Sequence, residues 1–187
     1  MRDTARSGVA ATSQDVLFNV RQPFIPIVGS TAVFPVRRIY CVGRNYAAHA
    51  REMGSDPDRE PFLFQRPSDA VQFVPIGKTI DHQYPSLTMN HHDELELVAA
   101  LGTGGRNIAP EKALDCVYGY AIGLDMTRRD LQRAMGDQKK PWEIGKSFDH
   151  AAPIGPIHPV GQVGHFTKGA IVLKVNGAGS RRPTCRR

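Results

Sequence analysis

Short runs of apolar and β-branched residues recur along the chain, and glycine, proline and polar residues separate them. Two runs, 24–28 and 32–34, flank Gly29-Ser30-Thr31, and prolines lie within or directly beside them, which predicts a hairpin at the edge of a sheet. The run 38–43 ends at a glycine and is expected to be a buried strand that enters a turn. Further strands are expected at 62–67, 94–101, 117–124 and 171–175, the last followed by a turn.

Three segments favour short helices. Asn45 can cap a helix that Gly54 would end. Pro110 opens one or two helical turns that run through Asp115, because proline is tolerated in the first turn of a helix. A third helix is expected to begin within 127–130, which matches a capping box.

Four residues after the expected strand 94–101 form a glycine-rich cluster, 102–105. A phosphate-binding loop is one interpretation of this cluster. However, no Lys-Ser or Lys-Thr pair follows it, and the next helix is in the wrong place for such a loop. We therefore expect a hairpin turn here.

Three carboxylates are the candidate ligands of a divalent cation. Glu94 and Glu96 are two positions apart, so on a strand their side chains share one face. Asp125 follows the expected strand 117–124, at its end. Three oxygen ligands suit a hard cation such as Mg²⁺ or Mn²⁺ and leave positions open for water and substrate. The alternative is that the two glutamates belong to a solvated strand face.

His49 and Glu52 are three positions apart on the expected helix 45–54, which makes them neighbours on one helix face. A carboxylate orients an imidazole and raises its basicity, which is the arrangement of a general base that activates water. An incidental pair on a surface helix is the alternative.

The segment that follows Asp125 offers groups that bind anions. Arg129 and Gln132 share a helix face, and a guanidinium beside an amide suits a dicarboxylate or a keto acid. Solvation or ion pairing of the arginine is the alternative. Lys146 lies between Trp142 and Phe148 in the sequence, so it could be partly desolvated and could hold an oxyanion or an enolate.

Composition argues against a nucleic-acid partner. The chain has 187 residues, of which 41% are hydrophobic and 22% charged, and its net charge is +6. The length and composition are those of a single soluble globular domain. Four of the six net charges come from the arginines of 181–187, which leaves +2 for the rest, and no basic stripe interleaved with aromatic residues is present.

Three further features predict a cytoplasmic protein. Cys41, Cys116 and Cys185 are odd in number and lack motif spacing, which favours thiols in a reducing compartment. Secretion is not expected, because the N-terminal residues lack the apolar stretch and cleavage site of a signal peptide. No apolar run approaches the length needed to cross a bilayer.

Four ordered motifs give the chain a resemblance to the fumarylacetoacetate hydrolase family, and within it to the fumarylpyruvate hydrolase branch. The resemblance extends from about Phe24 to Asn176. It divides the chain into a flexible arm at 1–23, a partial catalytic domain at 24–177 and a basic tail at 178–187 that resembles no part of the family. The matching motifs are YCVGRNYAAHAREMG at 40–54, ELELV at 94–98, YGYAIGLDMTRRD at 118–130 and PWEIGKSFD at 141–149.

The resemblance implies an α+β, mostly β fold, a mixed sandwich-like roll with short helices, and a homodimer. It implies that Mg²⁺ or Mn²⁺ is bound and that a small keto acid is the substrate. The implied roles are metal binding for Glu94, Glu96 and Asp125, water activation for His49 and Glu52, stabilisation of negative charge for Lys146, and substrate binding for Arg44, Arg129 and Gln132.

The chemistry implied is hydrolysis of a carbon–carbon bond in a 2,4-diketo acid, with fumarylpyruvate giving fumarate and pyruvate in the breakdown of aromatic compounds. Two alternatives within enzymes are hydrolysis of other acylpyruvates and decarboxylation of oxaloacetate, because the same metal–enolate chemistry serves all three.

Two departures from the family pattern bear on these expectations. The family usually has a histidine directly before the first glutamate, whereas Asp93 stands here and His92 precedes it; Asp93 would either tune the site or point outward. The tail 178–187 is expected to be irregular, and an altered reading frame after Asn176 would explain its composition. A rival expectation is therefore an inactive remnant that lacks the last family strands and at most binds a metal or a partner.

Overall fold

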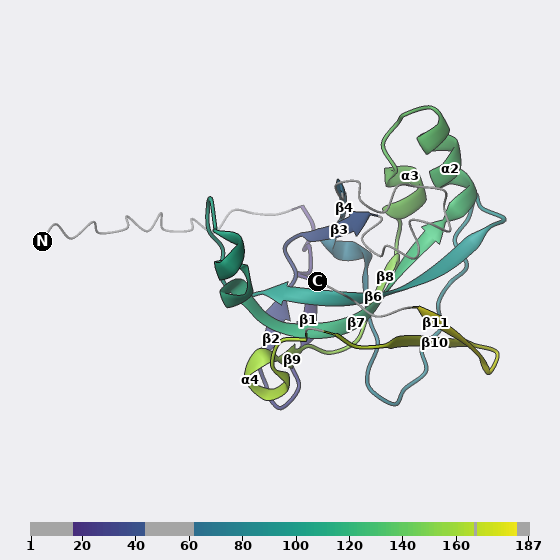
Figure 1. Cartoon of the computed structure of the whole chain (residues 1–187). Coiled ribbons are helices and arrows are strands. Elements are labelled where there is room, and N and C mark those ends of the chain that lie inside the picture. The colour runs from purple at the N-terminus through teal and green to yellow at the C-terminus, as the bar shows by residue number, and fades with distance from the viewer. Residues whose placement is uncertain (1–16, 44–61, 167, 183–187) are drawn as a thin grey trace, which may run out of the picture.

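The computed structural model describes residues 17–43, 62–166 and 168–182, and most of its regular structure is strand (Figure 1). The first half contains β1 (Phe24–Pro26), β2 (Val33–Pro35), β3 (Ile39–Gly43), β4 (Phe62–Arg66), the 3₁₀ helix η1 (Ser68–Ala70), β5 (Val71–Phe73) and β6 (His91–Leu101). The second half contains the 3₁₀ helix η2 (Pro110–Cys116), β7 (Val117–Arg128), α2 (Arg129–Asp137), α3 (Glu143–Lys146), β8 (Ala152–Ile154), β9 (His158–Pro159), α4 (Val160–Val163), β10 (Ile171–Val175) and β11 (Ala178–Arg182).

The long strands β6 and β7 form the centre of the molecule. They pair antiparallel from His91↔Arg128 to Leu101↔Val117, and β8 joins the other side of β7 and pairs in parallel with β5. The antiparallel pairing expected on either side of the glycine cluster is confirmed, with residues 102–116 as a long connection that contains η2. The helix expected from Pro110 is also confirmed, as η2.

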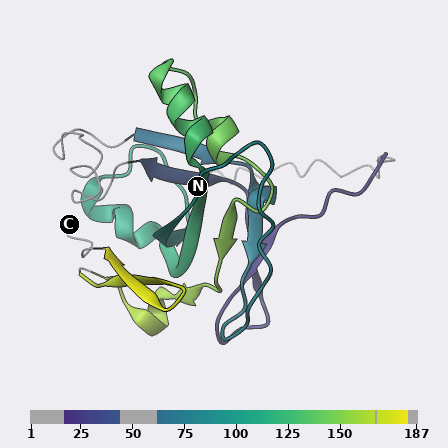
Figure 2. The same cartoon turned by 90° about the vertical axis from the view of Figure 1, so that its right-hand side faces the viewer.

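Side-chain alternation gives the two faces of β6 and β7 different chemistry. On one face Glu94 lies opposite Asp125, while the neighbouring register pair Leu95↔Leu124 belongs to the other face. That second face forms the floor of an apolar groove of about 820 Å³. Figures 1 and 2 show α2 and α3 on one side of β6 and β7 and the β10–β11 hairpin on the other.

Two apolar clusters fix the central strands. The larger joins β1, β6, β7 and β8 through the buried residues Ile25, Ile27, Val36, Ala100, Ala121, Ala152, Ile154 and Ile157. The smaller packs Met126 of β7 against Ala70, Phe148 and Ala151. The edge hairpin expected near residue 30 is confirmed as β1–β2, and a backbone bond from Val28 to Ile157 attaches it to the rest.

Four expectations about local structure are wrong. β3 is not buried, because Tyr40 and Val42 are about half exposed and, among the strands that the structure describes, only β4 pairs with it. β7 does not end before Asp125 but continues to Arg128, because β6 pairs with it along that whole length.

The other two corrections concern a helix start and the tail. The capping box is not formed, because α2 begins only at Arg129, and Asp130 instead accepts bonds from the Thr88 hydroxyl and the Met89 amide. Residues 178–182 are not irregular, because they form β11, which pairs antiparallel with β10 after a turn at Asn176 and Gly177.

Two of the cysteines, Cys41 and Cys116, are free thiols in the described part of the chain. Within that part, none of the helices has the length and apolar character required to span a membrane.

We predict that low pH destabilises the structure around the first residue of β6, His91. His82 and His91 are stacked with ring centroids 5.3 Å apart, and burial lowers the pKa of both, with Asp93 opposing the shift at His91. The folded protein therefore favours neutral rings, whereas the unfolded chain binds protons below about pH 6.5, so stability falls as the pH falls through that value. The melting temperature should drop between about pH 7.5 and about pH 5.5.

A double variant, His82→Gln with His91→Gln, should melt with a shallower dependence on pH. His158→Gln is the control, because β9 pairs with the opposite end of β7. If the double variant and the wild type show the same dependence in a fluorescence melt, the histidine pair is not the cause.

Candidate active site

A cluster of buried charged side chains lies on the polar face of β6 and β7, beneath α2 and α3. Glu94 and Asp125 are cross-strand partners, with side chains 9% and 14% exposed. The ammonium of Lys146 lies between them, 2.7 Å from Glu94 Oε2 and 2.8 Å from Asp125 Oδ2. The two carboxylates therefore converge on a single cation.

Lys146 reaches this position from the end of α3, and its side chain is only 2% exposed. The Thr127 hydroxyl lies 2.7 Å from the ammonium, and the ring of Phe64 covers it at 5.3 Å. Trp142 packs edge-on against Phe62 and Phe64, with ring centroids 4.9 and 5.9 Å away. The sequence-based expectation of a desolvated lysine beside aromatic residues is confirmed, although Phe64 on β4 supplies the covering ring.

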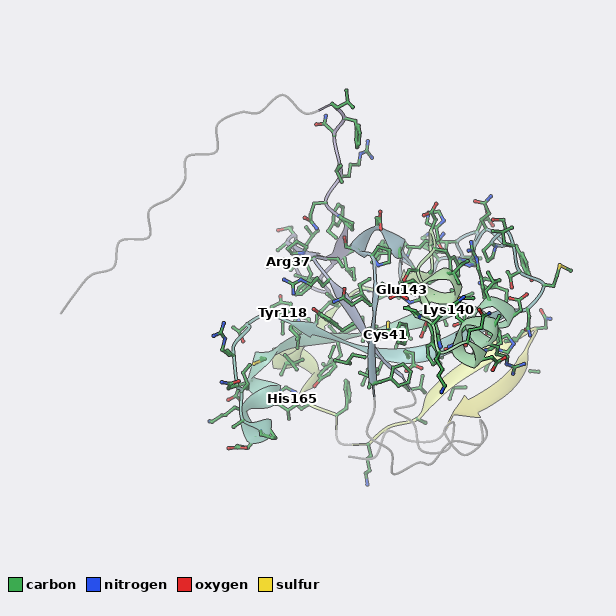
Figure 3. All side chains as sticks on the ribbon, turned by 90° about the horizontal axis from the view of Figure 1, so that it is seen from above. Arg37, Cys41, Tyr118, Lys140, Glu143 and His165 are labelled. Carbon is green, nitrogen blue, oxygen red and sulfur yellow. The ribbon has the colours of Figure 1, made fainter. Side chains whose placement is uncertain are left out.

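Close packing of α3 on α2 depends on Gly145. A Cβ at this position would lie 2.7 Å from the backbone nitrogen of Gln132 and 2.8 Å from its Cα, so a side chain does not fit without movement of the backbone. α3 also contacts β4, where the Ser147 hydroxyl donates to the carbonyl of Gln65 at 3.1 Å. Glu143 at the start of α3 and Cys41 on β3 are labelled in Figure 3.

Arg129 and Gln132 enter the cluster from the first turn of α2. Arg129 is 4% exposed, donates to Glu94 Oε1, and donates to Gln132 Oε1 at 2.5 Å. The prediction that these two side chains share a face is confirmed. Solvation as an alternative for Arg129 is wrong, whereas its ion pairing is real and its partner is a candidate metal ligand.

Two residues of the cluster were not identified from the sequence. Arg66, 3% exposed at the end of β4, donates to Asp125 Oδ1 and to the carbonyls of Lys146 and Met126. Because an arginine at a strand end before a proline usually faces solvent, no local pattern indicates its burial. The capping-box pattern predicts a helix start at Thr127, whereas strand alternation from Asp125 places Thr127 on the polar face.

Ion pairing and burial act in opposite directions on the pKa values here. Burial alone would raise the pKa of Glu94, but Lys146 and Arg129 outweigh burial and lower it to about 2. For Lys146 burial dominates and lowers the pKa to about 8, although Glu94 opposes this. Burial also lowers the pKa of Arg66 to about 10. Glu94 is therefore ionised at neutral pH, and cations closely match its charge.

Glu96, the third candidate metal ligand, is half buried and opposes Gly123 in the strand register. In the part of the chain that the structure describes, no three His, Cys, Asp or Glu side chains are grouped as metal ligands. The donor set of Glu94 and Asp125 nevertheless suits a hard divalent cation, because carboxylate oxygens are the ligands that such an ion prefers. In this structure the position on which the two carboxylates converge holds the Lys146 ammonium. The three-carboxylate metal site stays a prediction.

The region before Glu94 places Asp93 and His92 on opposite faces of β6. Asp93 opposes Met126, which belongs to the smaller apolar cluster, so Asp93 lies on the face away from Glu94. His92 shares the face of Glu94; burial lowers its pKa first, and the nearby charge of Arg129 lowers it further. The histidine next to the site is therefore His92.

Three other predicted site residues, Arg44, His49 and Glu52, lie outside the described residues, as does the helix expected at 45–54. Their assignments as substrate-binding residue and water-activating pair stay predictions.

Comparison with known proteins identifies the family to which this chain belongs. The family model described as "Fumarylacetoacetate (FAA) hydrolase C-terminal" matches residues 38–187. The chain belongs to the fumarylacetoacetate hydrolase family. This is a family of enzymes, and the expectation of a mostly β fold with short helices is confirmed.

A solved structure of fumarylpyruvate hydrolase from Pseudomonas aeruginosa, in complex with Mn²⁺ and pyruvate, is 56% identical to this chain. The match covers 90% of this chain and 73% of that one, with a TM-score of 0.87. The human mitochondrial oxaloacetate tautomerase FAHD1 is 42% identical over 141 residues, and the bovine protein of the same name is 40% identical over 141 residues. These matches cover 75% of this chain and 62% of each relative.

We predict that removal of the Lys146 ammonium destabilises the fold strongly. Lys146→Met leaves Glu94 and Asp125 facing each other without the cation between them, and breaking a buried ion pair from one side costs about 3–5 kcal/mol. Urea denaturation followed by circular dichroism measures this cost as a loss in the free energy of unfolding.

The double variant Glu94→Gln with Lys146→Met should recover part of the loss, because it removes charge of both signs. Lys112→Met is the control: Lys112 forms an exposed pair with Asp115 at 3.8 Å, and its loss should change stability by less than about 1 kcal/mol. Equal stability of Lys146→Met and Lys112→Met would contradict the prediction.

Proposed function

We propose that this chain provides the site of a metal-dependent hydrolase that cleaves a carbon–carbon bond in a 2,4-diketo acid, with fumarylpyruvate as the substrate and fumarate and pyruvate as products. The observation that carries the proposal is the buried cluster in which Lys146 joins Glu94 and Asp125 while Arg129 and Gln132 border it. The 56% identity to a fumarylpyruvate hydrolase that binds Mn²⁺ and pyruvate supports it. A role in the breakdown of aromatic compounds belongs to the same proposal.

Glu94, Glu96 and Asp125 would hold Mg²⁺ or Mn²⁺. Bound there, the ion would serve as a Lewis acid and as a template for a keto acid. The ionised state of Glu94 at neutral pH supports this assignment, because a carboxylate must be deprotonated to bind a metal.

Lys146 is proposed to stabilise the negative charge of a leaving enolate. Its ammonium is a preorganised, buried donor that the ring of Phe64 covers, with Trp142 packed against that ring, and such donors act more strongly away from water than in it. Arg129, held in place by Gln132, would bind a carboxylate of the substrate. His49, oriented by Glu52, would remove a proton from the attacking water, and Arg44 would bind substrate.

A second candidate is enolate chemistry on oxaloacetate, which needs the same lysine and the same carboxylates. It is favoured by the two curated relatives named oxaloacetate tautomerase, which are 40% and 42% identical to this chain. Hydrolysis of other acylpyruvates is a third variant of the same chemistry. An inactive member of the family is the alternative from a different class, and absence of a cooperative melt would favour it.

We further propose that the chain forms a homodimer in the cytoplasm. The apolar groove on the second face of β6 and β7 supports self-association, because Ile76, Ile122 and Phe166 on its lining are about half or more exposed.

Replacement of the proposed metal ligands should abolish metal-dependent turnover. Glu94→Gln and Glu96→Gln keep the shape of each side chain and remove its charge, so we expect a loss of more than about 100-fold in Mn²⁺-dependent cleavage. Loss of the ultraviolet band of fumarylpyruvate measures this cleavage.

Glu96→Gln shows whether a loss of activity in Glu94→Gln is more than a folding defect, because Glu96 is only half buried and its substitution should disturb the fold less. Glu111→Gln, an exposed carboxylate on η2, is the matched control and should retain wild-type activity. Turnover at the wild-type rate in both ligand variants would refute the metal assignment.

The two leading substrates are distinguished by a direct comparison. We expect kcat/KM for fumarylpyruvate to exceed that for oxaloacetate by at least about 10-fold, because Arg129 and the metal would hold the two ends of the longer substrate. Spectrophotometric assays on the same preparation provide both values. The opposite ratio would favour the oxaloacetate candidate.

A further inference from the structure

We propose that Arg66 is a positioning residue of this site, which fixes the Asp125 carboxylate and the end of α3 relative to each other so that Lys146 and the metal ligands act together. The inference rests on the proposed function, since it assigns Arg66 a role in that same reaction. It is carried by the contacts of one buried guanidinium with three separate acceptors.

The three acceptors come from two elements, β7 and α3, that are both far from Arg66 in the sequence. Nη1 donates to the carbonyl of Lys146 at the end of α3, and Nη2 donates to Asp125 Oδ1 and, at 2.8 Å, to the carbonyl of Met126 on β7. Arg66 itself lies on β4, which faces α3. One side chain therefore connects three elements that meet at the site.

These contacts close a ring. Asp125 gives one carboxylate oxygen to Arg66 and the other to the ammonium of Lys146, while the backbone carbonyl of Lys146 accepts from Arg66. Because both oxygens are held, the carboxylate cannot rotate about its terminal bond. The same ring holds the main chain of Lys146 at one end and its ammonium at the other.

The planar guanidinium suits this position, and an ammonium does not. Arginine presents several N–H donors in a fixed fork, so it reaches a carboxylate and two carbonyls at once. A lysine at position 66 would keep the positive charge but offers one nitrogen on a shorter, more flexible side chain. Geometry and charge can therefore be separated by substitution.

The test compares Arg66→Lys and Arg66→Met with the wild-type full chain. Three quantities are measured: the Mn²⁺ dissociation constant by electron paramagnetic resonance, kcat and KM for fumarylpyruvate, and the melting temperature. Arg128→Lys is the matched control, because Arg128 also donates to a carbonyl of α3, that of Ile144 at 3.5 Å, but is bonded to neither carboxylate.

We expect Arg66→Lys to melt as a folded protein, to bind Mn²⁺ about 10-fold more weakly, and to lose about 10–100-fold in kcat, as is typical of residues that orient metal ligands. KM should change by less than about 3-fold, because Arg66 acts through Asp125 and Lys146 and not on the substrate itself. Arg66→Met should show the same pattern more strongly. Arg128→Lys should match the wild type.

Three results would overturn the inference. Wild-type Mn²⁺ affinity and kcat in Arg66→Lys would mean that charge alone suffices. A loss of activity in proportion to the folded fraction, with unchanged Mn²⁺ affinity, would mean that Arg66 only supports the fold. Equal losses in Arg128→Lys would mean that any disturbance of α3 has this effect.

Failure of the proposed function gives a different result. A wild-type chain that binds Mn²⁺ but leaves fumarylpyruvate intact would overturn the proposed reaction, and the Mn²⁺ affinities of the variants would still decide the role of Arg66. A wild-type chain that binds no Mn²⁺ would overturn both.

Discussion

The ammonium of Lys146 lies between carboxylates on two neighbouring strands, and the arrangement around it follows from the need to satisfy those charges away from water. Glu94 and Asp125 are brought opposite each other by the strand register, which would leave two anions in contact. Lys146, Arg129 and Arg66 approach from α3, α2 and β4 and neutralise them. The cluster thereby determines where these three elements can lie.

Such a cluster adds little net stability. The pKa of Glu94 is lowered because Lys146 and Arg129 stabilise its ionised form more than burial destabilises it. The pKa of Lys146 is lowered because burial destabilises its charged form more than Glu94 stabilises it. Apolar residues of similar volume would often be as stable in such a position. A network of this kind is better explained by chemistry than by folding, which agrees with its composition of oxygen donors and preorganised cations.

The elements and site residues that a local period specifies can be predicted from the sequence. Glu94 and Glu96 alternate with Leu95 and Leu97, so the pairing of acidic and apolar faces could be predicted, and the hairpins needed only turn residues and β-rich runs. Features that depend on a partner distant in the sequence could not be predicted. Arg66 is buried because acceptors from β7 and α3 surround it, and Asp125 lies within a strand because β6 extends that far. Residues 178–182 form a strand because β10 lies beside them.

Because Gly145 has no side chain, the geometry of this site depends on a position that carries no charge. A Cβ at position 145 would overlap the backbone of Gln132. Even a single methyl group would therefore push α2 and α3 apart. The ammonium of Lys146 would then move away from Glu94 and Asp125, although none of the charged residues had been substituted. The properties of this site thus depend on main-chain spacing, through a residue that carries no functional group.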